Sequence, residues 1–403
     1  MVSYFLFLVL LQFSGGASGY YNFVEVLEEP VTGIRAKRQL LNTTRKWPNG
    51  VVYYDYDSSI SPEKIKLVII ATNLISKDTC IKFERNTKRE GNYILFVNST
   101  GCSSRLGMAG KGEQTLQFSD RCMDYGSVIH ELMHSMGISH TVSRYDRDKF
   151  VNVKLANNSH AANFNLRTDK DSYIAVPYEY GSVMHYSHKA GGTVLIPKEA
   201  QFLYTMGNLR ISFYDMVNIN VHYSCGCEKK LACANGGYTN PSDCKTCICP
   251  SGYGGNLCYE FVDNEVEELH ATNQWQDYSR TFQAPKYYSG IFIHYETLTI
   301  HAPKDRPIQV EITEMKGFEK SYGCNENGVE IKYMGDPRIT NPLHCSSANV
   351  SLVYTGKLNP MPIILYTKTN KTSTFGFRYR YADFWLSDNE MGTNGYDDYQ
   401  YLL

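Results

Sequence analysis

Hydrophobic and polar positions follow one pattern in the first half of the chain and another in the last third. Residues 51–55 and 93–97 alternate with the period of a β-strand, whereas residues 61–77 repeat apolar positions at helical spacing behind Ser61 and Pro62. Beyond residue 262, short alternating segments separated by turn residues occur at 288–295, 308–312, 350–354, 363–366 and 375–381. The pattern predicts an α+β domain followed by an all-β sandwich.

The first nineteen residues have a pattern of their own. An apolar run is followed by small residues at 16–19, which is typical of a secretory signal peptide over residues 1–19. As a membrane anchor the run is too short, and no other segment reaches spanning length. We therefore expect a secreted, extracellular protein with no membrane span.

A basic cluster marks the end of the next segment. Arg35-Ala36-Lys37-Arg38 resembles a furin-type processing site, although basic runs also occur on solvated surfaces. Its place between the signal and Trp47 favours cleavage after Arg38. The prediction is a propeptide over 20–38, a zymogen, and Gln39 as the mature N-terminus.

Composition narrows the class of protein. The chain has 403 residues, a formal net charge of −1 and a pI near 6.8, which argues against nucleic acid or an acidic membrane surface as the main partner. Twelve cysteines are typical of an oxidising compartment. Five glycosylation sequons agree with that environment: Asn42, Asn98, Asn157, Asn349 and Asn370.

The stretch HELMHSMGISH, residues 130–140, carries the strongest chemical signal. On a helix expected from about Tyr125 to Met136, His130 and His134 lie one turn apart on the same face. Gly137 can end the helix and turn the chain, so that His140 returns as a third ligand. Three imidazoles bind one Zn²⁺ and leave a position open for water, which is typical of a catalytic site.

Two less specific interpretations of this stretch compete with a catalytic zinc site. A histidine pair with a glutamate occurs by chance in many proteins, but the added glycine and third histidine make coincidence remote. A structural zinc site is disfavoured, because such sites have four closed ligands.

Several motifs together resemble the astacin family of metzincin zinc endopeptidases. They are the zinc stretch, SVMHY at 182–186, RYDRD at 144–148, the cysteine-bounded segment 101–122 and RKWPNGVVYY from Arg45. The resemblance covers residues 39–226. The order of the modules that follow is most similar to that of a nematode astacin. It implies a catalytic domain of two subdomains, with a twisted sheet and the zinc helix.

The resemblance also implies residue roles. His130, His134 and His140 would bind one zinc ion per chain, with Glu131 as general base. Tyr186 would be an additional ligand that swings away and hydrogen-bonds the oxyanion, so it has both a metal and a catalytic role. Met184 would form the floor of the Met-turn. An extended substrate would lie along a strand near residues 115–118.

Two departures from the astacin pattern concern activation. Thr141 stands where astacins usually have the glutamate that anchors the mature N-terminus. The propeptide also lacks the aspartate that occupies the zinc in many relatives. Arg144, Asp146, Arg147 and Asp148 are interpreted as structural ion-pairing residues.

The cysteines divide among three modules. Six of them within residues 227–259 leave too few apolar residues for a core, and Cys244-x-x-Cys247 also fits a zinc knuckle. The glycine pattern around them resembles an EGF-like domain instead. From the resemblance we expect the pairs Cys80–Cys225, Cys102–Cys122, Cys227–Cys244, Cys233–Cys247, Cys249–Cys258 and Cys324–Cys345.

Residues 262–382 resemble a CUB-like domain. The segments 301–312 and 327–333 carry the resemblance together with FGFRYRY at 375–381 and the pair Cys324–Cys345. The domain's usual first disulfide is missing. Its acidic calcium site is not recognisable either, so a protein-binding role is favoured over calcium binding. Residues 383–403 form a polar, acidic tail.

The combined interpretation is a secreted zinc endopeptidase that acts on proteins or peptides, with extracellular matrix or cuticle proteins as candidate substrates. The alternative is a secreted binding or structural protein with an inactive peptidase domain, acting through its EGF-like and CUB-like modules. The complete ligand set with Glu131 and Tyr186 favours the enzyme. Oligomeric state is not predicted.

Overall fold

The computed structural model describes residues 40–41, 44–157, 159–168, 170, 172–262, 266–285 and 293–382, all within one compact unit. The predicted signal peptide, the propeptide with Arg38, the sequon Asn42 and the tail 383–403 lie outside these residues. Within the described ranges, no helix has both the length and the apolar character that a membrane crossing requires.

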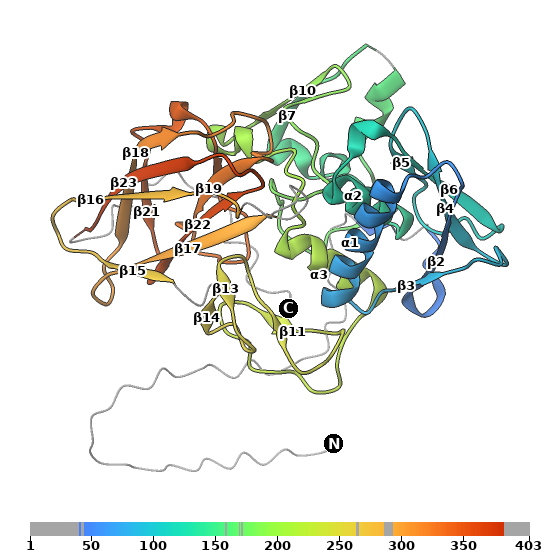
Figure 1. Cartoon of the computed structure of the whole chain (residues 1–403), viewed down its shortest axis with the longest axis horizontal. Helices are drawn as coiled ribbons and strands as arrows, with labels where there is room; N and C mark the ends of the chain where they lie inside the picture. Colours follow the sequence, from blue (N-terminus) through green and yellow to red (C-terminus); the bar gives the residue numbers. More distant parts are fainter. Residues whose placement is uncertain are drawn as a thin grey trace, which may run out of the picture. The chain divides into compact units, whose positions relative to one another are not determined.

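The first subdomain is a five-stranded sheet with two helices on one face (Figure 1). Its strands, in spatial order, are β3 (Lys82–Arg85), β2 (Val51–Tyr56), β4 (Tyr93–Asn98), β6 (Glu113–Phe118) and β5 (Ser103–Ser104). All pairs are parallel except β5 with β6. The helices are α1 (Pro62–Asp78) and α2 (Tyr125–Ser135), and their apolar faces share one core with the sheet.

Helix α1 forms where its sequence predicts. The Ser61 hydroxyl accepts a hydrogen bond from the Lys64 N–H, and a proline occupies the first turn. Val68, Ala71 and Ile75 recur at helical spacing and are fully buried.

The second subdomain has little regular structure. It contains the pair β1 (Leu40–Leu41) with β8 (Ser172–Tyr173), the sheet β7 (Val151–Lys154), β10 (Thr193–Pro197) and β9 (Lys189–Ala190), and helix α3 (Phe213–Tyr223). Short 3-10 turns connect these elements in both subdomains: η1 (Pro48–Gly50), η2 (Asp120–Cys122), η3 (Thr141–Ser143), η4 (Arg147–Lys149), η5 (Ser159–Phe164) and η6 (Ala200–Tyr204).

Six disulfides staple the chain, and they are the pairs that the sequence resemblance implies: Cys80–Cys225, Cys102–Cys122, Cys227–Cys244, Cys233–Cys247, Cys249–Cys258 and Cys324–Cys345. The disulfide-rich module has two small hairpins, β11 (Tyr238–Thr239) with β12 (Cys247–Ile248) and β13 (Tyr253–Gly254) with β14 (Glu260–Phe261). All six of its cysteines are paired, so the zinc-knuckle alternative has no thiolate ligands here.

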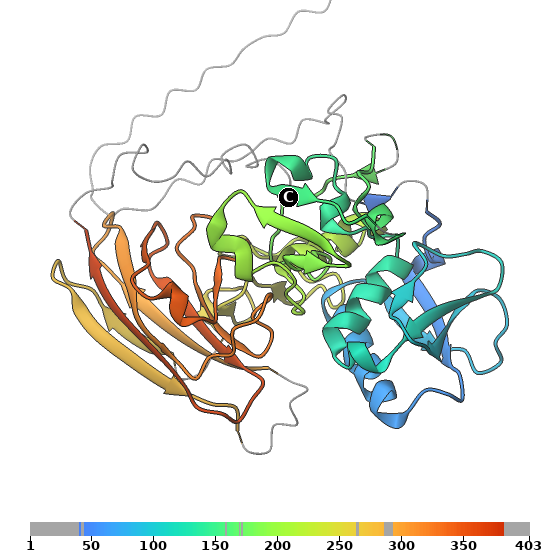
Figure 2. The same ribbon diagram turned by 90° about the horizontal axis from the view of Figure 1, so that it is seen from above.

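The C-terminal β-sandwich packs two sheets face to face (Figure 2). One sheet contains β15 (Glu267–His270), β17 (His294–His301), β22 (Met361–Thr367), β19 (Asn327–Ile331) and β20 (Leu343–His344). The other contains β16 (Gln276–Phe282), β23 (Ser373–Tyr381), β18 (Ile308–Lys316) and β21 (Val353–Gly356), with the turn η7 (Ser347–Asn349) before β21. Inward-facing residues such as Val310, Ile363 and Phe377 form its core.

The predicted α+β class with an all-β C-terminal sandwich is confirmed, but one strand boundary is corrected. Of the strand predicted at 288–295, residues 288–292 lie outside the described residues, and β17 includes His294 and Tyr295. The strand predicted at 350–354 begins at Val353, because the Ser346 hydroxyl caps the preceding 3-10 turn and holds Val350 at its end. Of the predicted sequons, Asn98, Asn157 and Asn370 are exposed and Asn349 is half-buried; their glycosylation stays a prediction.

A buried histidine in the sandwich predicts acid sensitivity. Neither ring nitrogen of His344 has a hydrogen-bond partner within the described part of the chain, and burial lowers its pKa to about 3. In the unfolded chain the imidazole titrates near 6.5, so the unfolded state binds the extra proton first as the pH falls. The stabilisation is complete above pH 6.5 and is lost at about 1.4 kcal/mol per unit between pH 6.5 and 3.

We therefore expect the melting temperature of the wild type to fall more steeply from pH 7 to pH 5 than that of His344→Leu, as measured by calorimetry. Equal losses in the two proteins would contradict this assignment.

Candidate metal centre

The three histidines of the zinc stretch converge on one point. Helix α2 is capped by Asp124, whose carboxylate accepts from the Ser127 N–H. The helix presents His130 and His134 on one face. His140 returns after the helix ends: its Nε2 lies 3.1 Å from His130 Nε2 and 2.9 Å from His134 Nε2. Among the described residues this is the one cluster of three or more His, Cys, Asp or Glu side chains with metal-binding geometry.

Gly137 makes the return of the chain possible. Its φ is +96°, a left-handed conformation that ends the helix. A Cβ here would also meet Thr44 Oγ1 at 2.6 Å and His222 Nε2 at 2.9 Å. Backbone freedom and close packing together require glycine at this corner.

The donor set fits zinc. His130 Nδ1 donates to the Val183 carbonyl at 2.7 Å and His134 Nδ1 donates to the Ile138 carbonyl at 2.8 Å, so that both Nε2 atoms are left as acceptors aimed at the common point. Tetrahedral Zn²⁺ with Zn–N bonds of about 2.0 Å separates its nitrogens by about 3.3 Å, which is close to the observed spacing.

Burial keeps the imidazoles neutral, the form that binds metal. It is the main cause that lowers the pKa of His134 to about 3, with a second contribution from His130. The pKa of His130 is lowered by burial, and that of His140 is far below its usual value, first by burial and then by the neighbouring imidazoles.

Glu131 lies beside this cluster in a dry environment. Its side chain is 8% exposed, and its Oε2 has no hydrogen-bond partner among the described residues. Burial raises its pKa to about 7, opposed by a hydrogen bond from the Ser104 N–H. A buried carboxylate oxygen without a partner is a strong indication that the site accommodates a further polar group.

Tyr186 lines the other side of the centre. Its ring packs 4.3 Å from the ring of His140 and 5.1 Å from that of Phe164, measured between centroids. Burial, and then the charge of Glu131, raise the pKa of its phenol. The hydroxyl therefore stays protonated at neutral pH and can donate a hydrogen bond.

The turn at 182–186 is held by hydrogen bonds to residues from other segments of the chain. Met184 is fully buried, and its carbonyl accepts from the Thr141 N–H at 3.0 Å. Asp215, at the start of α3, accepts from the Ser182 hydroxyl at 2.5 Å and from the Val183 N–H at 2.9 Å. Sequence reasoning missed Asp215, although the Ser212-x-x-Asp215 capping box before an apolar run was a readable signal.

The residues predicted to be structural after His140 form ion pairs, and all of them except the exposed Asp148 are buried. Arg144 forms a bidentate pair with Asp146 at 2.9 Å and donates to the carbonyls of Val176 and Pro177. Arg147 pairs with Asp148 and donates to backbone carbonyls around it. These contacts fix the loop that returns His140.

The segment predicted to lie at the mature N-terminus is held by backbone pairing. Leu40 is fully buried and pairs with Tyr173 and with Ile138, two residues before His140. Thr141 is also fully buried. Gln39 lies outside the described residues.

The expected substrate strand needs correction. Residues 115–118 belong to β6, which is paired with β4 along its length and with β5 at Leu116 and Gln117. The edge strand next to β6 is β5, whose Ser104 N–H reaches Glu131. Because β5 is only two residues long, sequence alternation did not reveal it.

Comparison with known proteins gives concordant results. The sequence profile of the astacin peptidase family matches residues 39–224. Zinc metalloproteinase nas-17 of Caenorhabditis elegans is 45% identical over 384 residues, with 92% of this chain and 87% of the relative covered. Zinc metalloproteinase nas-16 of the same organism is 42% identical, with 92% and 86% covered.

Among solved structures, high choriolytic enzyme 1, a hatching enzyme zinc-protease from Oryzias latipes, is 32% identical with a TM-score of 0.41; the match covers 45% of this chain and 94% of that one. The metal-binding geometry and the near full-length relatives lead to the same conclusion. This chain belongs to the astacin family of peptidases and is a zinc metalloendopeptidase.

Proposed function

We propose that this protein is a secreted endopeptidase that hydrolyses internal peptide bonds of extracellular proteins, with Glu131 as the general base. The observation that carries the proposal is the unpartnered, buried Oε2 of Glu131 beside three converging imidazoles. The alternative, an inactive peptidase domain that serves only for binding, has no comparable support, because every side chain that the reaction needs is present at one place.

The proposed roles follow from the acid–base properties of the site. His130, His134 and His140 would hold a zinc ion, which would supply Lewis acidity to activate a water molecule and to polarise the scissile carbonyl. Glu131 accepts the proton that this water loses on attack and later donates it to the leaving amine. The Tyr186 hydroxyl donates to the developing oxyanion of the substrate.

Secretion is supported by the N-terminal sequence together with the disulfides. Every cysteine of the described residues is paired, as expected for an oxidising compartment. We propose that the chain is made as a zymogen with a signal over 1–19 and is cleaved after Arg38. Matrix or cuticle proteins are the proposed substrate class.

Replacing Glu131 by alanine tests the general base. We expect Glu131→Ala to lower kcat on a quenched peptide library by about 10²–10⁴-fold while zinc stays bound, since no ligand is lost. Glu63→Ala, which removes an exposed carboxylate at the start of α1, is the matched control and keeps wild-type activity. Equal rates for the Glu131→Ala and control proteins would remove Glu131 from the mechanism.

Replacing Tyr186 by phenylalanine tests the oxyanion donor. Tyr186→Phe keeps the ring packing on His140 and removes only the hydroxyl. We expect kcat to fall on the order of a hundredfold, with zinc content unchanged. An unaltered kcat is incompatible with the proposed role.

Maturation is tested at the basic cluster. In secreting cells, Arg38→Ala should yield a product that retains the segment before residue 39, because the processing protease requires the final arginine. N-terminal sequencing of the secreted protein decides the matter. A variant that still begins at Gln39 would refute the cleavage site.

A further inference from the structure

We propose that the C-terminal β-sandwich supports the active site. Its β19–β20 loop, residues 332–342, positions the turn that carries Met184 and Tyr186. Glu179 is the positioning residue that connects the loop to this turn. The inference rests on the proposed function and goes beyond it, because it makes catalysis depend on a module outside the peptidase domain.

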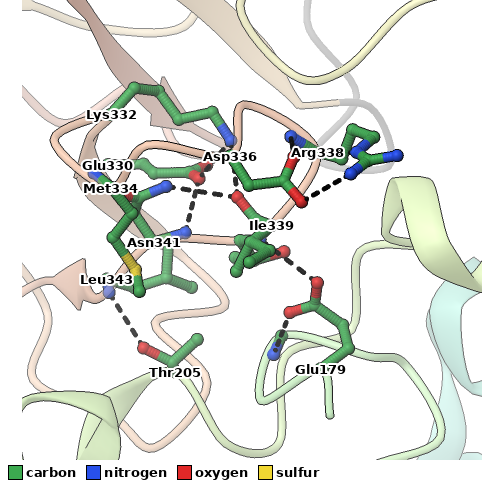
Figure 3. Close-up of polar contacts among 12 residues, drawn as sticks. Glu179, Thr205, Glu330, Lys332, Met334, Asp336, Arg338, Ile339, Asn341 and Leu343 are labelled. Carbon is green, nitrogen blue, oxygen red and sulfur yellow. Dashed lines mark hydrogen bonds and ion pairs between the residues drawn. The ribbon is translucent and has the colours of Figure 1, made fainter. Parts of the chain in front are cut away.

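The β19–β20 loop is internally braced (Figure 3). Lys332 and Glu330 form a fully buried ion pair at 3.0 Å, and Lys332 Nζ also donates to the Ile339 carbonyl at 2.7 Å. Asn341 donates through its N–H to Glu330 and accepts from the Met334 N–H. These buried hydrogen bonds and the ion pair rigidify the loop.

The braced loop packs into the core of the second catalytic subdomain. Met334 and Ile339 are buried in the cluster that includes Tyr178, Tyr180 and Tyr214. Polar contacts flank this apolar contact.

One of these polar contacts joins the Tyr214 hydroxyl to Asp336 at 2.9 Å, and another joins the Leu343 N–H to the Thr205 hydroxyl at 2.9 Å. The two modules thus share a continuous core rather than a solvated surface contact.

Glu179 connects the loop to the catalytic turn. It is 3% exposed; one carboxylate oxygen accepts from the Gly181 N–H at 2.8 Å, and the other accepts from the Thr340 N–H at 3.2 Å. Gly181 immediately precedes Ser182, the first residue of the turn. The carboxylate therefore ties the backbone before the turn to the backbone of the sandwich.

The turn is consequently held from two sides. Asp215 of α3 binds Ser182 and Val183, whereas Glu179 and Thr340 fix the chain just before them. Val183 in turn accepts from His130. Displacing the loop would shift the backbone of the turn, which orients His130 and carries Tyr186. This effect requires no contact between the sandwich and the substrate.

Close packing at Gly181 shows how tightly the loop is seated. A Cβ added to Gly181 would lie 2.5 Å from Thr340 Cβ and Cγ2 and 2.6 Å from its Oγ1, and these are its three nearest heavy atoms. The residue is not among those with a left-handed φ, so its backbone conformation is open to alanine. The added methyl group of Gly181→Ala would therefore clash mainly with Thr340, and the substitution perturbs the contact between the two modules.

The test uses the mature, full-length protein and a short quenched peptide. We expect Gly181→Ala to lower kcat by about tenfold or more, as misplacement by a fraction of an ångström does at active sites, with KM and zinc content close to wild type. Adding Thr340→Gly removes the clash, and the double variant Gly181→Ala/Thr340→Gly should recover most of the lost kcat.

A second glycine-to-alanine substitution, within the sandwich, is the control for damage to the sandwich alone. At Gly376 in β23, a Cβ would meet Glu314 Cβ at 2.8 Å, within the sandwich. Gly376→Ala should lower the melting temperature while leaving kcat of the folded protein unchanged. Loss of kcat in this control to the level of Gly181→Ala would overturn the inference, since any sandwich defect would then suffice.

The outcomes separate the inference from the proposed function. A wild type that cleaves no peptide refutes the proposed function. An active wild type with an equally active, folded Gly181→Ala overturns the inference, and so does a loss of kcat that Thr340→Gly fails to restore.

If Gly181→Ala does not fold, Glu179→Gln replaces it. The amide is nearly isosteric but presents an N–H₂ group to one of the two backbone donors, so kcat should fall with KM retained; an unchanged kcat overturns the inference.

Discussion

The structure depends on bringing three neutral imidazoles together, with His140 Nε2 at 3.1 Å from His130 Nε2 and at 2.9 Å from His134 Nε2. Such close approach of three nitrogens is unfavourable without a cation between them. Each imidazole ring is placed by its own part of the chain. Helix α2 carries His130 and His134, and the backbone carbonyls of Val183 and Ile138 fix the orientations of these two rings. The left-handed conformation of Gly137 and the buried Arg144–Asp146 ion pair bring His140 back to the same point.

The same constraint explains why distant parts of the chain are buried around the site. Val183 can orient His130 only if its own position is fixed, and Asp215 and Glu179 provide this from opposite sides. Glu179 in turn requires Thr340, 161 residues further along the chain. Support for the metal centre therefore extends through the second subdomain into the β-sandwich, whose buried Glu330–Lys332 pair keeps the supporting loop rigid.

Local features were predictable from sequence, and long-range contacts were not. Ser61 and Pro62 marked α1, and the spacing of His130, His134 and His140 marked the metal site, because each signal depends on residues close in the chain. The contact of Glu179 with Thr340 depends on how two modules dock, and no local pattern encodes it. Strand β5 was missed because two residues cannot show alternation, and the start of β21 was misjudged because the cap at Ser346 competes with strand propensity.

The most direct test of the central claim is the X-ray absorption spectrum of zinc in the mature, full-length protein. The account predicts one zinc per chain with three imidazole nitrogens at about 2.0–2.1 Å, oxygen ligands completing the shell, and no sulfur. A first shell with thiolate sulfur, or with fewer than three imidazoles, would contradict it.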